Sequence, residues 1–171
     1  MRPFFFVLAL VGTLASAASA QMPKYRVTAT ADKTFDFSTI KTYSWTKGWT
    51  AYDKDVDQQI CAAIDRELEG VGLTKVESGP GDVIATYASL KRTDVDLKKK
   101  PAQKGGMRPE YPVGSLVVLL LEPGTRRELF RARADVKLPA DPAQFGPVVA
   151  GTVAEMFAKY PRPKTGNSAA R

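Results

Sequence analysis

The sequence predicts an α+β domain: a mostly antiparallel sheet of about five to six strands with two helices packed on one face. Two observations lead to this prediction. Apolar residues recur at helical spacing over residues 53–71, and apolar and charged residues alternate over residues 128–138, as they do in a half-buried strand. Short links rich in Gly and Pro separate the other apolar segments, which favours strands joined by hairpins.

The first twenty residues have the features of a signal peptide. Arg2 precedes an apolar run at residues 4–14, and Ala18-Ser19-Ala20 is a peptidase cleavage pattern. The run is too short to span a bilayer. We therefore expect cleavage between Ala20 and Gln21 and a soluble periplasmic or secreted protein with no transmembrane segment.

The remaining chain has the length of one domain, which we place at residues 21–163. Residues 164–171 are polar and small, and we expect a disordered tail there. At the start of the domain, residues 25–30 alternate as a strand. Residues 32–37 are expected to form a loop, and residues 42–45 a second short strand with Tyr43 and Trp45 on one face.

The predicted helix at residues 53–71 carries one apolar stripe, formed by Val56, Ile60, Ala63, Ile64, Leu68 and Val71. Aspartates in or before its first turn complement the helix dipole and can cap free N–H groups. Gly70 and Gly72 are expected to end the helix. Cys61 lies near the edge of the stripe, so we expect its thiol to be buried.

Two more strands are expected at residues 73–76 and 82–90. From residue 91 to residue 112 the chain is basic and contains several Pro and Gly, so we expect a long loop. Residues 116–121 are apolar on both faces, which is typical of a central strand covered on each side.

A turn at residues 122–127 should return the chain into the alternating strand at residues 128–138. The second helix is expected to start at Pro147, because proline suits the first helical position. Its apolar stripe contains Val149, Val153, Met156, Phe157 and Tyr160.

The amino-acid composition excludes several classes of catalytic and metal site. The chain has no histidine and one cysteine, so histidine-based triads, His-ligated zinc, thiolate zinc sites and internal disulfides cannot form. We expect no catalytic, cofactor-binding or metal site. The net charge of +7 could attract nucleic acid, but export disfavours that partner, and an anionic envelope surface such as lipid headgroups or lipopolysaccharide suits the charge better.

Several acidic residues are candidate sites. Residues 53–57 resemble a calcium loop, but Gln58 and Ile64 stand where such a loop has Gly and Glu, so helix capping explains the aspartates. A glycosidase-like carboxylate pair could come from Glu67, Glu69, Glu77, Asp94 or Asp96. Their spacing brings no two of them together, and we expect solvated surface charges.

The residues that we single out as possible partner contacts are aromatic or basic: Trp49, Lys98, Lys99, Lys100, Arg131 and Arg133. Trp49 follows the second strand in a polar segment, where a large aromatic residue can contact a partner. The lysines belong to the basic loop, which is either a solvated connection or an electrostatic contact with an anionic surface.

A resemblance to a known family extends over five parts of the chain: 35–45, with its Tyr-x-Trp strand, 60–72, 81–87, the hairpin formed by 114–121 and 128–134, and 153–163. These segments resemble a family of bacterial envelope proteins known only as domain of unknown function 4136. Many members look like lipoproteins, whereas this chain lacks the lipid-bearing cysteine, and Phe130 stands where members often have Trp. The resemblance implies no activity and no catalytic positions.

The sequence therefore predicts an exported, non-catalytic envelope protein, a binding or assembly module whose partner is an envelope protein or an anionic surface. Two alternatives remain open. A hydrolase that uses only carboxylates would need two acidic groups converging in a pocket, and a carrier of a small apolar ligand would need a cavity between the helices and the sheet.

Overall fold

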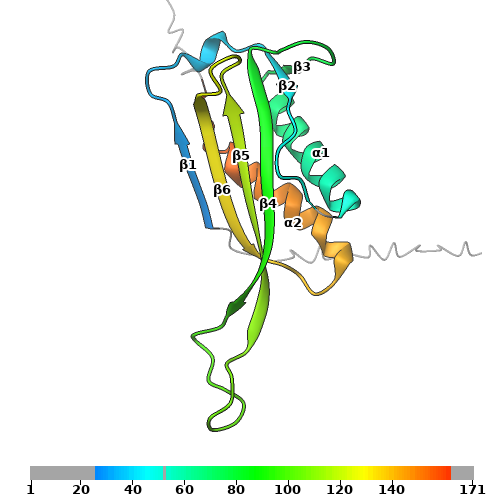
Figure 1. The fold of residues 1–171 in the computed structure, drawn as a ribbon, viewed down its shortest axis with the longest axis vertical. Coiled ribbons are helices and arrows are strands. Elements are labelled where there is room, and N and C mark those ends of the chain that lie inside the picture. Colours follow the sequence, from blue (N-terminus) through cyan, green and yellow to red (C-terminus); the bar gives the residue numbers. More distant parts are fainter. Residues whose placement is uncertain (1–25, 52, 163–171) are drawn as a thin grey trace, which may run out of the picture.

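The computed structural model describes residues 26–51 and 53–162 (Figure 1). Along the chain the elements are β1 (Arg26–Ala31), η1 (Phe37–Thr39), β2 (Thr42–Trp45), α1 (Lys54–Gly70), β3 (Thr74–Lys75), β4 (Val83–Val95), β5 (Glu110–Leu121), β6 (Glu128–Lys137), η2 (Pro142–Gln144) and α2 (Phe145–Phe157). This is an α+β fold, as predicted. The predicted signal peptide, its cleavage site and the tail at 164–171 lie outside the described residues.

The six strands form one sheet in the order β1-β6-β5-β4-β2-β3. Strands β1, β6, β5 and β4 pair antiparallel, whereas β2 is parallel to both of its neighbours, β3 and β4. Parallel pairing of β2 with β3 requires a long crossover, and α1 supplies it. The sheet is thus mostly antiparallel with one parallel end, an order that the sequence did not predict.

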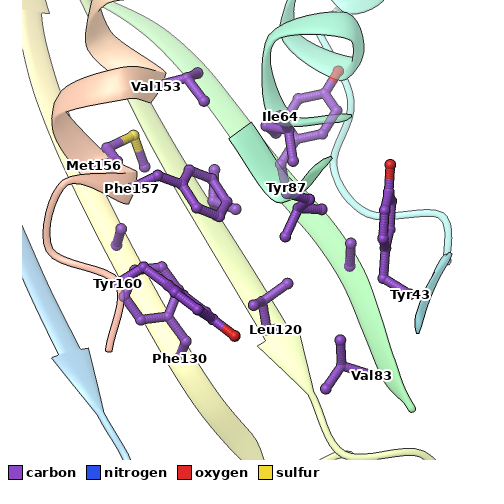
Figure 2. Packing of buried hydrophobic residues seen from close by; sticks show 14 of the residues in the cluster. Tyr43, Ile64, Val83, Tyr87, Leu120, Phe130, Val153, Met156, Phe157 and Tyr160 are labelled. Atoms are coloured by element: carbon purple, nitrogen blue, oxygen red, sulfur yellow. The ribbon is translucent and has the colours of Figure 1, made fainter. Parts of the chain in front are cut away.

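The core joins both helices to one alternating set of strand residues. The predicted stripe of α1 is buried at Ile60, Ala63, Ile64 and Leu68, and α2 buries Val153, Met156 and Phe157 against the same cluster. Figure 2 shows these α2 side chains near Leu120 and Phe130 of the sheet. Tyr160 follows α2 and packs edge-on against Phe130, with ring centroids 5.4 Å apart.

The loop predicted at residues 91–112 is shorter than expected, because strands occupy both of its ends. β4 continues to Val95 and β5 begins at Glu110, and their pairing is continuous from Val95–Glu110 to Ile84–Leu121. Only residues 96–109 form the connection. The basic sequence concealed the strands because no core covers this part of the hairpin, so no apolar alternation is required there.

Three further predictions are corrected. Val117 and Leu119 on the second face of β5 are half-buried, so this central strand is fully covered on one face only. Cys61 is half-buried, because it lies beside the stripe of α1 and not within it. Helix α2 begins at Phe145, two residues before Pro147, which still falls in the first turn, where a missing N–H removes no helical hydrogen bond.

No helix in the described ranges is both long and apolar enough to cross a membrane.

Candidate functional site

A groove of about 510 Å³ lies between the N-terminal halves of the two helices and the middle of the sheet. Its helical wall is mostly apolar and includes Val56, Ile60, Phe145, Val148 and Val149. Leu116, Val136 and Leu138 form the apolar part of the opposite wall, on β5, β6 and the residue after β6. We call this the helix–sheet groove.

The groove exists because small residues occupy the sheet beneath the helices. Ser89 of β4 and Gly114 of β5 follow the alternation that places Tyr87 and Leu116 in the core. Gly114 contributes no side chain, and a Cβ built there would lie 2.9 Å from Leu138 Cδ2. Towards the other end of the sheet, Phe130 and Leu120 fill the same layer, and it is closed.

Most polar side chains along the groove are already engaged or lie at its exposed edge. Asp53 caps α1, accepting the backbone N–H groups of Asp55 at 2.9 Å and Val56 at 3.2 Å. Thr152 donates its hydroxyl to the Val148 carbonyl at 2.6 Å. Lys91 is exposed and contributes a cation. The groove can therefore enclose an apolar group.

A second, more polar pocket of about 420 Å³ lies beside β2, α1 and β3 and contains Asp65. The carboxylate accepts hydrogen bonds from Tyr43 Oη at 2.8 Å and Trp45 Nε1 at 2.7 Å, and it pairs with Lys75 Nζ at 3.2 Å. Burial, followed by the hydrogen bond and charge of Asp65, raises the pKa of Tyr43, so its hydroxyl remains a donor. Asp65 of α1 thus links this helix to β2 and β3.

Two other groups line this second pocket and bear on its chemistry. Glu77 places a further carboxylate there, beside an Asp65 that already has three donors. Cys61 also lines it, and burial together with the charges of Asp57 and Asp65 raises the pKa of its thiol. A raised pKa keeps the sulfur in its weakly nucleophilic thiol form.

Two of the other candidate carboxylates, Asp94 and Asp96, do not line this pocket. Asp94 pairs with Arg92 at 2.8 Å on the β4–β5 hairpin, and Asp96 accepts the backbone N–H of Lys98 at its end. Asp53 is the N-cap of α1, so the interpretation as helix capping is confirmed. Within the described residues, no three side chains of the His, Cys, Asp or Glu type gather as a metal site would require.

The structure does not gather the predicted contact residues into one site. The Trp49 side chain is 84% exposed. Its backbone carbonyl accepts the Ser89 N–H at 3.0 Å. Lys98, Lys99 and Lys100 lie in the connection between β4 and β5. The side chains of Arg131 and Arg133 are exposed on β6 and paired with Glu128 and Asp135, each at 3.3 Å.

Sequence reasoning missed the helix–sheet groove. Its signal was present in the small side chains of Ser89 and Gly114 at core-facing positions of long strands. The strand predicted at residues 82–90 includes Ser89, but the strand predicted at residues 116–121 begins after Gly114, so the two small residues were not recognised as neighbours facing the helices. Thr50 and Ala51, next to Trp49, also line the groove.

Comparison with known proteins adds a family and a fold. A family model described as "Domain of unknown function (DUF4136)" matches residues 27–162. No curated protein matches the sequence.

Several solved structures have a similar fold. A dodecamer of a PelC point variant from Paraburkholderia phytofirmans aligns with a TM-score of 0.53 and 11% identity, covering 79% of this chain and 95% of that chain. A PDZ domain protein from Parabacteroides distasonis aligns with a TM-score of 0.55 and 16% identity over 86% of this chain, which spans 39% of that protein's chain. At these identities the similarity establishes the fold alone.

Proposed function

The chain belongs to the DUF4136 family, and we propose that it is an exported, non-catalytic cell-envelope protein that binds a small apolar ligand in its helix–sheet groove. The observation that carries this proposal is the groove itself. Its volume of about 510 Å³ falls within the roughly 300–1,000 Å³ of small-molecule sites. Its walls are mostly apolar, which favours a ligand with an apolar chain or ring.

The charges at the groove suggest how such a ligand would be oriented. Lys91 is exposed, whereas the nearby carboxylate of Asp53 is engaged in capping α1. An amphiphile with an anionic end fits this arrangement, with its apolar chain between Val149 and Leu116 and its charge towards Lys91. A fatty-acid-like molecule has this chemistry.

A carboxylate-only hydrolase is the alternative. One observation favours it, namely that Asp65 and Glu77 line the same pocket. Against it, Asp65 is held by Tyr43, Trp45 and Lys75, whereas a general acid or nucleophile needs a free oxygen directed at the substrate. The similar PelC structure is a dodecamer, but at 11% identity we do not extend this assembly to the present chain.

The proposal that the protein is exported rests on its N-terminal sequence. Residues 1–20 combine Arg2, an apolar run and the Ala18-Ser19-Ala20 pattern, so we propose cleavage before Gln21 and a periplasmic or secreted location. Intact-mass analysis of the protein recovered from the periplasmic fraction tests this. A mass that retains residues 1–20 would refute it.

The ligand proposal is tested by displacement of a fluorescent probe. Anilinonaphthalene sulfonate, which has an aromatic body and an anionic end, should bind the purified protein and be displaced by dodecanoate. Ser89→Trp should fill the groove and reduce binding of both compounds at least tenfold. Thr28→Trp, at an exposed position of β1, provides the matched control and should bind as the parent does.

Circular dichroism establishes that both variants are folded. If folded Ser89→Trp binds dodecanoate as tightly as the parent protein, the groove is not the site and the proposal fails. Hydrolysis of a glycoside or ester substrate that is lost in Glu77→Gln would instead support the alternative.

A further inference from the structure

The β4–β5 hairpin reaches beyond the rest of the sheet. β6 ends at Lys137, which pairs with Val113, so beyond this point β4 and β5 pair only with each other. Figure 1 shows the arm that results, extending away from the part of the molecule that contains both helices. We call residues 96–109, which connect its two strands, the hairpin tip.

The hairpin tip is strongly basic. It carries one carboxylate, Asp96, and five cations: Lys98, Lys99, Lys100, Lys104 and Arg108. In the described part of the chain, no ion pair involves any of these five cations. Arg131 and Arg133 differ, because acidic neighbours on β6 already balance their charge. The tip therefore presents uncompensated positive charge to an anionic partner.

Large apolar side chains are exposed at the same place. Leu97 is 75% exposed and Met107 is 88% exposed, and Val95 at the end of β4 is 45% exposed. The backbone hydrogen bond from Asp96 to Pro109, at 2.8 Å, holds the two sides of the tip together. Arg108 adds a hydrogen bond to the Leu97 carbonyl. Leu97 follows β4 and Met107 precedes β5, so these hydrogen bonds hold together the two chain segments that carry them.

We propose that the hairpin tip docks the protein on the surface of an anionic lipid bilayer. The five cations face the headgroups, and Leu97 and Met107 enter the boundary between headgroups and acyl chains. A polyanionic polymer would satisfy the cations and leave the two apolar side chains in water, so the combination of charge and apolar exposure favours lipid. The arm lets the tip reach a bilayer without the helices touching it.

This surface is separate from the helix–sheet groove, and its test is independent of the ligand proposal. Protein beginning at Gln21 is mixed with vesicles of equal parts phosphatidylethanolamine and phosphatidylglycerol, or of phosphatidylcholine alone, and the bound fraction is measured by flotation. Binding should require phosphatidylglycerol and should weaken as salt rises.

Two tip variants separate the contributions of charge and apolar contact. Combining Lys98→Glu, Lys99→Glu and Lys100→Glu should weaken vesicle binding by about a hundredfold or more, since each lysine near an anionic surface contributes about fivefold. Combining Leu97→Ser and Met107→Ser should weaken vesicle binding and leave retention on a heparin column unchanged.

The matched control reverses the same number of charges at exposed positions on the body: Lys33→Glu, Lys54→Glu and Lys159→Glu. It should retain most of the vesicle binding. The proposal is overturned if the control loses as much binding as the tip variant. It is equally overturned if Leu97→Ser with Met107→Ser has no effect on vesicles, because the tip would then be a contact for polyanions only.

Discussion

Tyr43 of β2 donates its hydroxyl to the Asp65 carboxylate of α1 across 2.8 Å. The same oxygen of Asp65 accepts Trp45 Nε1 at 2.7 Å, so two aromatic side chains from one face of β2 converge on it. Tyr43 is fully buried, and its hydroxyl has no water to replace this acceptor. One carboxylate therefore attaches the parallel end of the sheet to the first helix.

Replacing Asp65 by Ala should lower the free energy of unfolding by about 3 kcal/mol, because two donors lose their acceptor and the Tyr43 hydroxyl stays buried. Adding Tyr43→Phe to Asp65→Ala should recover about 1 kcal/mol by removing the orphaned hydroxyl. Urea unfolding of the single and double variants measures both changes. Additive losses in the double variant would show that the two side chains are not coupled.

The aromatic pattern of residues 42–45 predicted a strand with Tyr43 and Trp45 on one face, and this is confirmed. The partner of both side chains could not be predicted, because Asp65 lies twenty or more residues away and its position depends on how α1 crosses to β3. The sequence fixes which faces are apolar. It does not determine strand order, since several orders bury the same faces.

Gly81 should tolerate no side chain. A Cβ there would lie 2.6 Å from the Tyr43 carbonyl carbon and 2.8 Å from the Ser44 nitrogen, and these backbone atoms cannot move without separating β2 from β4. Gly81→Ala should cost about 3 kcal/mol of stability.

The matched control for this steric prediction is Gly70→Ala. A Cβ at Gly70 meets nothing within 4 Å at the end of α1, so alanine should stabilise the helix by about 0.5–1 kcal/mol. Thermal unfolding distinguishes the two variants. Equal melting temperatures for Gly81→Ala and the parent would contradict the close approach of the two strands.

Asp135 should make stability depend on pH. Burial disfavours its charge, but hydrogen bonds from Ser115, Arg92 and Arg133 outweigh that effect and hold the pKa of Asp135 well below its usual range. A carboxyl whose pKa is lower in the folded state stabilises the fold above its unfolded pKa of about 3.9. This stability is lost as the pH falls through the folded pKa.

Asp135→Asn should therefore be less stable than the parent at neutral pH by about 1–2 kcal/mol. The difference should stay constant down to about pH 5 and shrink below about pH 4. Urea unfolding at a series of pH values gives both curves. A difference that does not change with pH would mean that the charge of Asp135 contributes nothing to stability.

The candidate sites illustrate where sequence reasoning stops. Trp49 is a possible partner contact by its place in a polar segment after the strand, and its side chain is exposed. The basic character of residues 98–100 was equally clear, but the arm that carries them was not, because charged strands lack the apolar alternation by which strands are recognised. The helix–sheet groove is defined by missing side-chain volume, which becomes visible only when three elements are packed together.

The apolar stripe of α1 is core, and its centre should be the most sensitive position on the helix. Ile64 is fully buried among the core residues shown in Figure 2. Ile64→Ala should cost about 2–5 kcal/mol, and Ile64→Asp more, because an unpaired carboxylate would enter an apolar layer. A domain has only about 5–15 kcal/mol of stability, so the aspartate variant should be unfolded or degraded.

Lys99→Asp, in the exposed hairpin tip, is the control for the Ile64 variants and should change stability by no more than about 0.5 kcal/mol. If urea unfolding gave Ile64→Ala and Lys99→Asp the same midpoint, the stripe would be a contact surface and not the core.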